Sequence, residues 1–163
     1  MIEIRPIQKH EILEAKRMIF TVAQVIFQES ISLEESIVKH IAQGKLGEMD
    51  DVEKNYFENG GTFLVMVEND RIIGTGAIRF LEKGVCELKR LWLLTEYHGR
   101  GLGYRMIREL FNIAKEKGYR TMRLATDKVY QARAVKFYQR LGFYEIPRYG
   151  GDNPEDMAME LIL

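Results

Sequence analysis

The chain has 163 residues, of which 46% are hydrophobic and 29% charged, with 24 Lys and Arg against 24 Asp and Glu. This length suits a single domain over residues 1–163 with a sizeable core, and the composition excludes a disordered chain. No apolar run approaches the roughly 18–20 residues of a membrane span, and the first residues lack the pattern of a secretory signal. The single cysteine, Cys86, excludes an internal disulfide and a cysteine zinc cluster. We expect a soluble, cytoplasmic protein that binds no metal.

The first part of the sequence predicts one strand followed by helices. Residues 1–7 alternate apolar and polar side chains, and residues 12–27 carry apolar side chains at helical spacing. Ser32 opens the capping pattern Ser-x-x-Glu of a second helix, which should stop near Gly44. A weaker helical stretch follows over residues 49–58.

The pattern then changes to strands. Residues 62–68 and 71–81 predict a hairpin around the turn Asn69-Asp70, and residues 85–94 predict a further strand. These neighbouring strands should pair antiparallel.

The last part of the chain alternates helices and strands. It predicts a helix over residues 101–118, a strand over 120–126, a helix over 131–141 and a last strand over 156–163. The full order is β-α-α-β-β-β-α-β-α-β. An antiparallel hairpin followed by a β-α-β unit predicts an α+β (α/β mixed sheet) domain, with a central, mostly antiparallel sheet flanked by helices.

Charge is unevenly distributed along the chain. Residues 29–60 contain eight acidic and three basic residues, whereas residues 97–148 contain twelve basic and four acidic residues. The basic half suits an anionic ligand, but two solvated helix faces of opposite sign also explain the pattern. A nucleic-acid-binding domain ranks last among the functions considered, because the chain has neither a recognition motif nor a net positive charge.

The most informative segment alternates glycine with other residues between a strand and a helix. Its residues are His98, Gly99, Arg100, Gly101, Leu102, Gly103 and Tyr104. Glycines let backbone amides face a ligand, and the helix start adds free N–H groups and the positive end of its dipole. This combination suits a phosphate or pyrophosphate, although the loop matches neither a Walker loop nor Gly-x-Gly-x-x-Gly. A tight turn that needs glycine for geometry alone is the alternative.

A second informative segment, residues 131–143, is a predicted helix that ends at Gly142. Tyr138 is its candidate proton donor, although core packing with a solvated hydroxyl is the commoner role of a helical tyrosine. Its basic residues either face a phosphate or form a solvated stripe; they are Arg133, Lys136 and Arg140.

Together these segments resemble the GNAT superfamily of acyl-CoA-dependent N-acyltransferases. The family signature Gln/Arg-x-x-Gly-x-Gly/Ala corresponds to residues 98–103. A second family element, Asn-x-x-Ala-x-x-x-Tyr followed by x-x-Gly-Phe, matches residues 131–143, and residues 87–93 are similar to the family's splayed fourth strand. The resemblance covers nearly the whole chain, so it implies the GNAT fold.

The resemblance implies acetyl-CoA as co-substrate. The amides of the glycine loop would hold the pyrophosphate, and the backbone at Leu91 and Leu93 would pair with the pantetheine arm and supply an oxyanion donor. The cofactor-binding residues that it implies are Leu91, Trp92, Leu93, His98, Gly99, Arg100, Gly101, Leu102, Gly103, Tyr104, Gln131, Arg133 and Phe137.

The resemblance also implies two catalytic residues. Tyr138 stands at the position of the family tyrosine that protonates the departing CoA thiolate. Glu87 matches a carboxylate that in some members acts as general base, often through water, and an attacking ammonium needs such a base. The alternative for Glu87 is a surface carboxylate paired with Lys89. Cys86 should point to the opposite face of the sheet and serve as a small core residue.

Three residues depart from the family pattern. His98 replaces the usual Gln or Arg, which should change CoA binding only modestly because most phosphate contacts there are backbone. Thr95 stands where many members have proline, and this bears on loop rigidity. Gln131 stands where Asn is common, which puts its side-chain contact to the cofactor in doubt.

The function implied is transfer of an acetyl group from acetyl-CoA to a primary amine in a ternary complex. The acceptor would be a small-molecule or peptide amine, and the acidic residues 29–53 fit a cationic one. The alternatives are another acyl-CoA, a protein amine, or a catalytically silent CoA-binding or regulatory module. Neither a nucleic acid nor a membrane is expected as a partner. Homodimers are common in the family, and no residue here specifies one.

Overall fold

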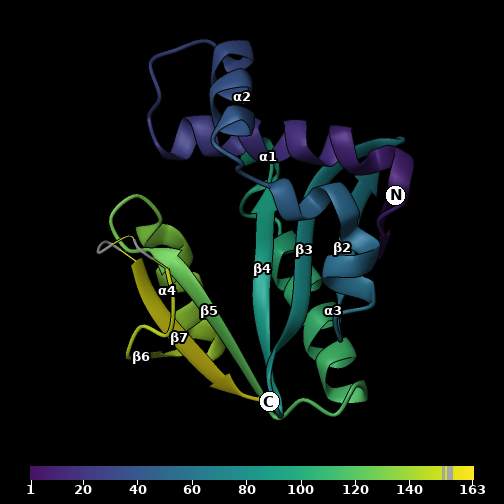
Figure 1. The fold of residues 1–163 in the computed structure, drawn as a ribbon, viewed down its shortest axis with the longest axis vertical. Coiled ribbons are helices and arrows are strands. Elements are labelled where there is room, and N and C mark those ends of the chain that lie inside the picture. Colours follow the sequence, from purple (N-terminus) through teal and green to yellow (C-terminus); the bar gives the residue numbers. More distant parts are fainter. Residues whose placement is uncertain (152, 154–155) are drawn as a thin grey trace.

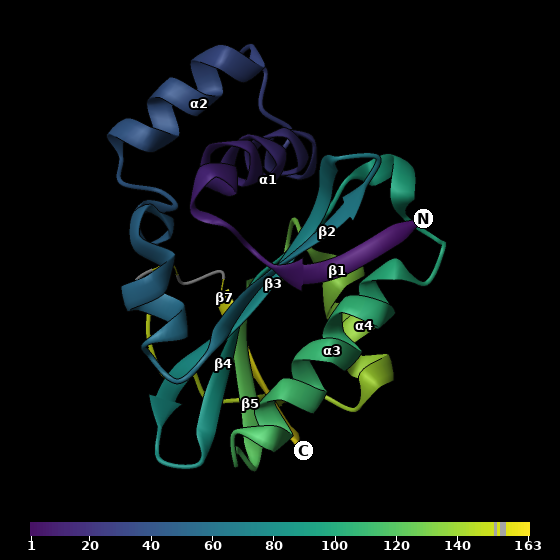
Figure 2. The same ribbon diagram turned by 90° about the vertical axis from the view of Figure 1, so that its right-hand side faces the viewer.

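The protein is described by a computed structural model for residues 1–151, 153 and 156–163. Seven strands form one sheet in the order β1-β2-β3-β4-β5-β7-β6 (Figure 1). The strands are β1 (Ile2–Pro6), β2 (Thr62–Glu68), β3 (Arg71–Glu82), β4 (Val85–Leu93), β5 (Thr121–Asp127), β6 (Tyr144–Ile146) and β7 (Asp156–Ile162). The α-helices are α1 (Ile12–Ile26), α2 (Leu33–Ala42), α3 (Leu102–Glu116) and α4 (Ala132–Leu141). Helices lie on both sides of the sheet, with α3 and α4 on one side and the turns of residues 47–57 on the other (Figure 2).

Within this sheet, neighbouring strands pair antiparallel except β4 and β5, which are parallel. This confirms the predicted mixed, mostly antiparallel sheet. The β2–β3 hairpin turns at Asn69 and Asp70, whose φ angles of 49° and 62° suit the tight turns of right-twisted hairpins.

The predicted helices form with the expected ends. The Ser32 hydroxyl accepts a hydrogen bond from the Glu35 amide at 3.2 Å, which caps α2, and the chain leaves that helix through Gly44 at φ 78°. The weaker stretch over residues 49–58 forms two short turns instead of one helix: the 3₁₀ turn η2 (Gly47–Asp51) and the π-helical turn η3 (Glu53–Phe57).

The core lies between the sheet and its helices. Gly76 of β3 faces α3, and a Cβ atom there would lie 2.8 Å from Met106 Cγ, so the glycine allows the close approach of helix and sheet. Cys86 is fully buried, which confirms it as a core residue, and burial raises the pKa of its thiol to about 12.

The sheet opens between β4 and β5. These strands pair only where Val85–Glu87 face Thr121–Arg123, and beyond that point they diverge (Figure 1). The register of β4 against β3 shifts next to Arg90, whose φ of 55° marks a bulge. The opening removes neighbouring backbone from one edge of β4 and so leaves room for a ligand between two strands.

Two further findings concern the described residues alone. None of their helices is long and apolar enough to cross a bilayer. No three of their His, Cys, Asp or Glu side chains come together as a metal site requires.

Candidate active site

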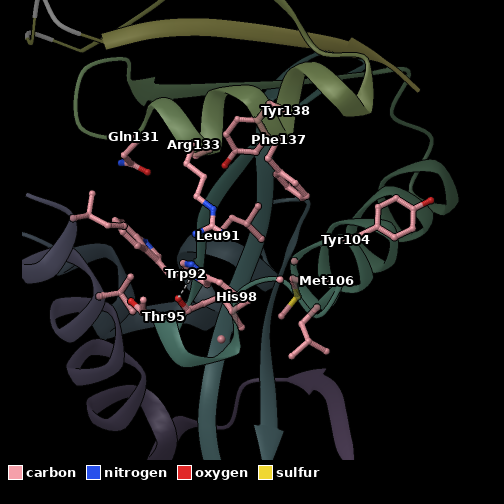
Figure 3. A pocket seen from close by; sticks show the side chains of 18 of the residues that line it. Leu91, Trp92, Thr95, His98, Tyr104, Met106, Gln131, Arg133, Phe137 and Tyr138 are labelled. Atoms are coloured by element: carbon pink, nitrogen blue, oxygen red, sulfur yellow. Dashed lines mark hydrogen bonds between the residues drawn. The ribbon is translucent and has the colours of Figure 1, made fainter.

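A cavity of about 730 Å³ lies between β4, the start of α3, α4 and the end of α1 (Figure 3). It brings together most of the residues that the sequence predicted for the site. They are Leu91, Trp92, Leu93, His98, Gly99, Gly101, Leu102, Gly103, Tyr104, Gln131, Arg133, Phe137 and Tyr138. We call this space the first cavity.

The glycine loop forms one wall of the first cavity. Gly99 and Gly101 have φ angles of 80° and 75°, a left-handed conformation that favours glycine where the chain turns into α3. Gly103 has an ordinary backbone, and a Cβ atom there would lie 3.7 Å from Phe137 Cζ. None of the described side chains caps the first turn of α3, so its amides and the positive end of its dipole are available to an anion.

Two arginines of α4 line the first cavity together with the glycine loop. Arg133 and Arg140 both line it, whereas Lys136 does not. Figure 3 shows Arg133 extending from α4 toward Leu91 of β4. The first cavity therefore offers an anion two sources of positive charge, the arginines of α4 and the free amides of α3.

Two residues of the predicted loop point elsewhere. Arg100 does not line the first cavity; its guanidinium carbon lies 5.0 Å from the centre of the Tyr97 ring. Tyr104 borders the cavity, but its ring turns outward in Figure 3 and packs under Arg108, 5.6 Å from the guanidinium carbon. A cofactor contact by the Arg100 side chain stays a prediction.

His98 ties the loop to the end of β4. Its Nε2 lies 2.9 Å from the carbonyl oxygen of Leu93, so this nitrogen carries the proton and donates it (Figure 3). The other ring nitrogen, Nδ1, is buried without a hydrogen-bond partner in the described part of the chain. The departure from Gln or Arg at this position thus adds a contact that fixes the loop against the strand.

The first cavity also has an apolar wall that the sequence did not reveal. Val22, Val25 and Ile26 of α1 line it together with Met66 of β2. These residues belong to ordinary amphipathic patterns, so their periodicity predicts burial in a core and does not distinguish a ligand-facing position. The 62% exposure of Val25 fits an apolar side chain that faces an open cavity.

Tyr138 of α4 lies between the first cavity and a second cavity, which is described below. The residue is buried, its ring packs edge-on against Phe143 at 5.6 Å, and burial raises the pKa of its hydroxyl, which therefore stays protonated. Among the residues described, none forms a hydrogen bond with that hydroxyl. Its oxygen points into the space between α4 and β4 (Figure 3). Such a group can donate a proton to a ligand.

A second cavity of about 410 Å³ occupies the opening between β4 and β5. It shares Leu91, Trp92, Gln131 and Tyr138 with the first cavity. Its charged residues are Lys45, Lys89, Arg90, Asp127 and Asp156. These come from distant segments that carry no common motif, so sequence reasoning had no signal by which to find this cavity.

Glu87 is buried and lies outside both cavities. Its Oε1 accepts hydrogen bonds from Nε and Nη2 of Arg79, at 3.1 and 3.0 Å, and its Oε2 accepts one from the Tyr149 hydroxyl at 2.7 Å. The alternative of a surface carboxylate paired with Lys89 is therefore wrong, because the carboxylate is only 7% exposed and its cationic partner is Arg79.

A mixed sheet that opens between two parallel strands, with a glycine loop at a helix start beside the opening, is the architecture of an acyl-CoA N-acyltransferase. The profile of the Acetyltransferase (GNAT) family matches residues 30–143. That match covers more than half of the chain, and the chain therefore belongs to this family.

A curated protein with a similar sequence is also named as an N-acetyltransferase. The chain is 25% identical over 115 residues to the probable N-acetyltransferase family 8 member 5 of Mus musculus, covering 68% of this chain and 50% of that protein. This chain thus spans about half the length of that curated relative.

Two solved structures share the fold over nearly the whole chain. An acetyltransferase of the GNAT family from Staphylococcus aureus Mu50 has a TM-score of 0.81 at 21% identity, covering 98% of both chains. The PaiA N-acetyltransferase of Thermoplasma acidophilum, solved in complex with coenzyme A, has a TM-score of 0.77 at 21% identity, covering 100% of this chain and 99% of that one. These likenesses confirm the predicted fold.

Proposed function

We propose that residues 1–163 act as a single N-acetyltransferase domain, which transfers the acetyl group of acetyl-CoA to a primary amine by direct attack in a ternary complex. The observation that carries this proposal is the position of Tyr138, which borders both cavities. In the proposal the first cavity holds acetyl-CoA and the second holds the acceptor. The thioester then lies beside Tyr138, where the two cavities meet.

The first cavity fits acetyl-CoA in charge and shape. The free amides of α3 and the two arginines of α4 suit the pyrophosphate, and the apolar wall suits the pantetheine arm. The backbone at Leu91 and Leu93 would supply the oxyanion donor. The PaiA protein, whose fold this chain shares, was solved with coenzyme A.

The proposed reaction is an aminolysis of the acetyl-CoA thioester. The acceptor ammonium loses one proton to a base, and its nitrogen attacks the thioester carbonyl carbon. A C–N bond forms, the C–S bond breaks, and Tyr138 donates its proton to the departing sulfur. The second proton leaves the nitrogen and restores the Tyr138 hydroxyl through solvent. The products are the N-acetyl amide, the CoA thiol and one free proton.

Glu87 is the proposed base, acting through water. It lies two residues before Lys89 on a regular part of β4, so both side chains face the same side of the sheet. Lys89 lines the second cavity, and Glu87 is its neighbour on the same face of β4, which supports a base on the acceptor side. A water molecule could reach Oε2 once the Tyr149 hydroxyl moves aside.

The test is thiol release from acetyl-CoA in the presence of a panel of primary amines, with mass spectrometry of the acetylated product. We expect thiol and N-acetyl amine to form in equal amounts. Binding of acetyl-CoA without transfer to any amine would instead identify a silent CoA-binding module. Faster turnover with a longer acyl-CoA would correct the acyl group.

A further inference from the structure

The charged residues that line the second cavity indicate which class of amine it binds. This inference rests on the function proposed above. The acidic residues of the N-terminal segment do not form it. Glu29 bonds to Ser36 and His40, Glu48 pairs with Arg90, and Asp50 pairs with Lys16. None of the acidic residues between 29 and 53 lines either cavity. The expectation of a cationic acceptor therefore loses its structural basis.

The β4 wall of the second cavity carries an excess of positive charge. Arg90 lines the cavity and is paired with Glu48, and behind it Arg79 is paired with Glu87. Lys89 lies between these two pairs and is half-buried. Within the part of the chain that the structure describes, its ammonium has neither an ion pair nor a hydrogen bond. Glu87 and Glu48 attract this charge, but each is already paired with an arginine, so among the described residues Lys89 has no ion-pair partner of its own.

The surroundings of Lys89 destabilise its charged form as long as no anion binds to it. Burial lowers the pKa of the Lys89 ammonium, and the neighbouring Arg90 lowers it further. An anionic group in the cavity would reverse both effects, because it replaces lost solvation and offsets the arginine. The Lys89 ammonium is a compact charge with three donors, and it can bind a carboxylate through a charge-assisted hydrogen bond.

The wall of the second cavity opposite β4 carries negatively charged side chains. Asp127 of β5 and Asp156 of β7 are cross-strand partners, so their side chains share a face, and both line the second cavity. The Asp127 Oδ1 accepts hydrogen bonds from the amides of Val129 and Tyr130, both at 2.8 Å, which leaves Oδ2 for a ligand. A ligand between the two walls therefore meets a cation on β4 and carboxylates on β5 and β7.

We propose that the acceptor is a small amine that also carries a carboxylate, in the chemical class of the amino acids, and that Lys89 binds this carboxylate in the second cavity. The acceptor's ammonium would lie toward Asp127 and Tyr138, where the thioester is attacked. A volume of about 410 Å³ suits a ligand of that size.

The experiment compares amino acids with their own carboxamides as acceptors in the thiol-release assay. Wild type is measured beside Lys89→Met, Lys89→Arg and Lys83→Met, the last being a control at an exposed turn lysine. A carboxamide is the less basic amine and has more free base at neutral pH. A preference for the acid therefore reports the carboxylate and not the reactivity of the nitrogen.

We expect wild type to prefer the acids, and Lys89→Met to raise their KM so that this preference falls about 10- to 100-fold, as for one charge-assisted hydrogen bond. The carboxamides should be unaffected, Lys89→Arg should retain part of the preference, and Lys83→Met should match wild type. The ratio of acid to amide separates this role from a structural one, since a folding defect lowers both rates together.

Two results would overturn the inference while the acetyltransferase function stands: equal or better use of the carboxamides by wild type, or an equal loss of both acceptors in Lys89→Met. Binding of acetyl-CoA without transfer to any amine would overturn the proposed function, and this inference with it.

Discussion

The two cavities that meet at Tyr138 differ in the chemical groups that line them. The first is lined by glycine backbone, free helix amides, apolar side chains and two arginines, whereas the second is lined largely by charged side chains from distant segments. Backbone amides at a helix start recognise a phosphate in any protein that presents them. Charged side chains recognise only the ligand that matches their arrangement. The first cavity therefore suits a co-substrate shared by a family, and the second suits an acceptor particular to this chain.

Removing the Tyr138 hydroxyl should have the largest effect, because this residue lines both cavities. We expect Tyr138→Phe to lower kcat about 1,000-fold, within the range of general acids, and to leave the Kd for acetyl-CoA nearly unchanged. The ring packing against Phe143 is retained in this variant. Rapid-quench kinetics and calorimetry measure the two quantities. Tyr144→Phe, which removes an exposed hydroxyl bonded to Glu160, is the control.

Glu87→Gln should affect the acceptor chemistry and spare the cofactor. We expect kcat/KM for the amine to fall about 100-fold, with an unchanged Kd for acetyl-CoA. Tyr149→Phe keeps the carboxylate and removes only its hydrogen bond, so its rate should stay close to wild type. Equal losses in the two variants would show that Glu87 only positions its neighbours.

Gly103→Ala should affect only the first cavity. The added methyl would lie at ordinary contact distance from Phe137, so the free protein should be at least as stable as wild type. In the complex the methyl would crowd the cofactor, and we expect the Kd for acetyl-CoA to rise about 10-fold, or 1.4 kcal/mol. Gly47→Ala is the matched control, since nothing lies within 4 Å of its added carbon. A destabilised Gly103→Ala protein with normal affinity would contradict the assignment.

The smallest effect should be a pH dependence confined to the second cavity. Lys89 interacts with Arg79 of β3, Glu87 and Arg90 of β4, and Glu48 of η2, and burial is the main cause of its lowered pKa. It also shares the second cavity with Lys45, Asp127 of β5 and Asp156 of β7. A lowered pKa means that the ammonium loses its charge at a lower pH than an ordinary lysine, near 10.4. The preference for carboxylate acceptors over carboxamides, calculated per free amine base of each acceptor, should therefore fall a few-fold as the pH rises toward that value. A preference that is flat over pH 7–10 would contradict this prediction.

The sequence predicted the first cavity far better than the second, for a physical reason. The glycine loop and the Tyr138 helix place ligand-facing atoms close together in the chain, so a short motif specifies their geometry. The second cavity joins Lys45, Lys89 and Asp156, which come together only after the sheet has formed. Nothing in their local sequence distinguishes them from surface charges.

The order of helices and strands along the chain was predicted correctly, with local exceptions. β6 was missed because a strand of only three residues leaves almost no pattern. The stretch over residues 49–58 forms two turns that bury Met49 and Tyr56 fully, so tertiary packing decided its shape. Arg90 adopts a φ of 55° at the bulge although it is not a glycine, and the residue types of β4 give no sequence signal for this conformation.

The most direct test of the account is a calorimetric titration of the purified protein with acetyl-CoA, with dephospho-CoA and ATP as comparison ligands. We expect saturable binding with a Kd on the order of micromolar, weakened in Gly103→Ala and unchanged in Tyr138→Phe. The absence of binding at high acetyl-CoA concentration would contradict it. The glycines at positions 99, 101 and 103 would then serve only the turn into α3.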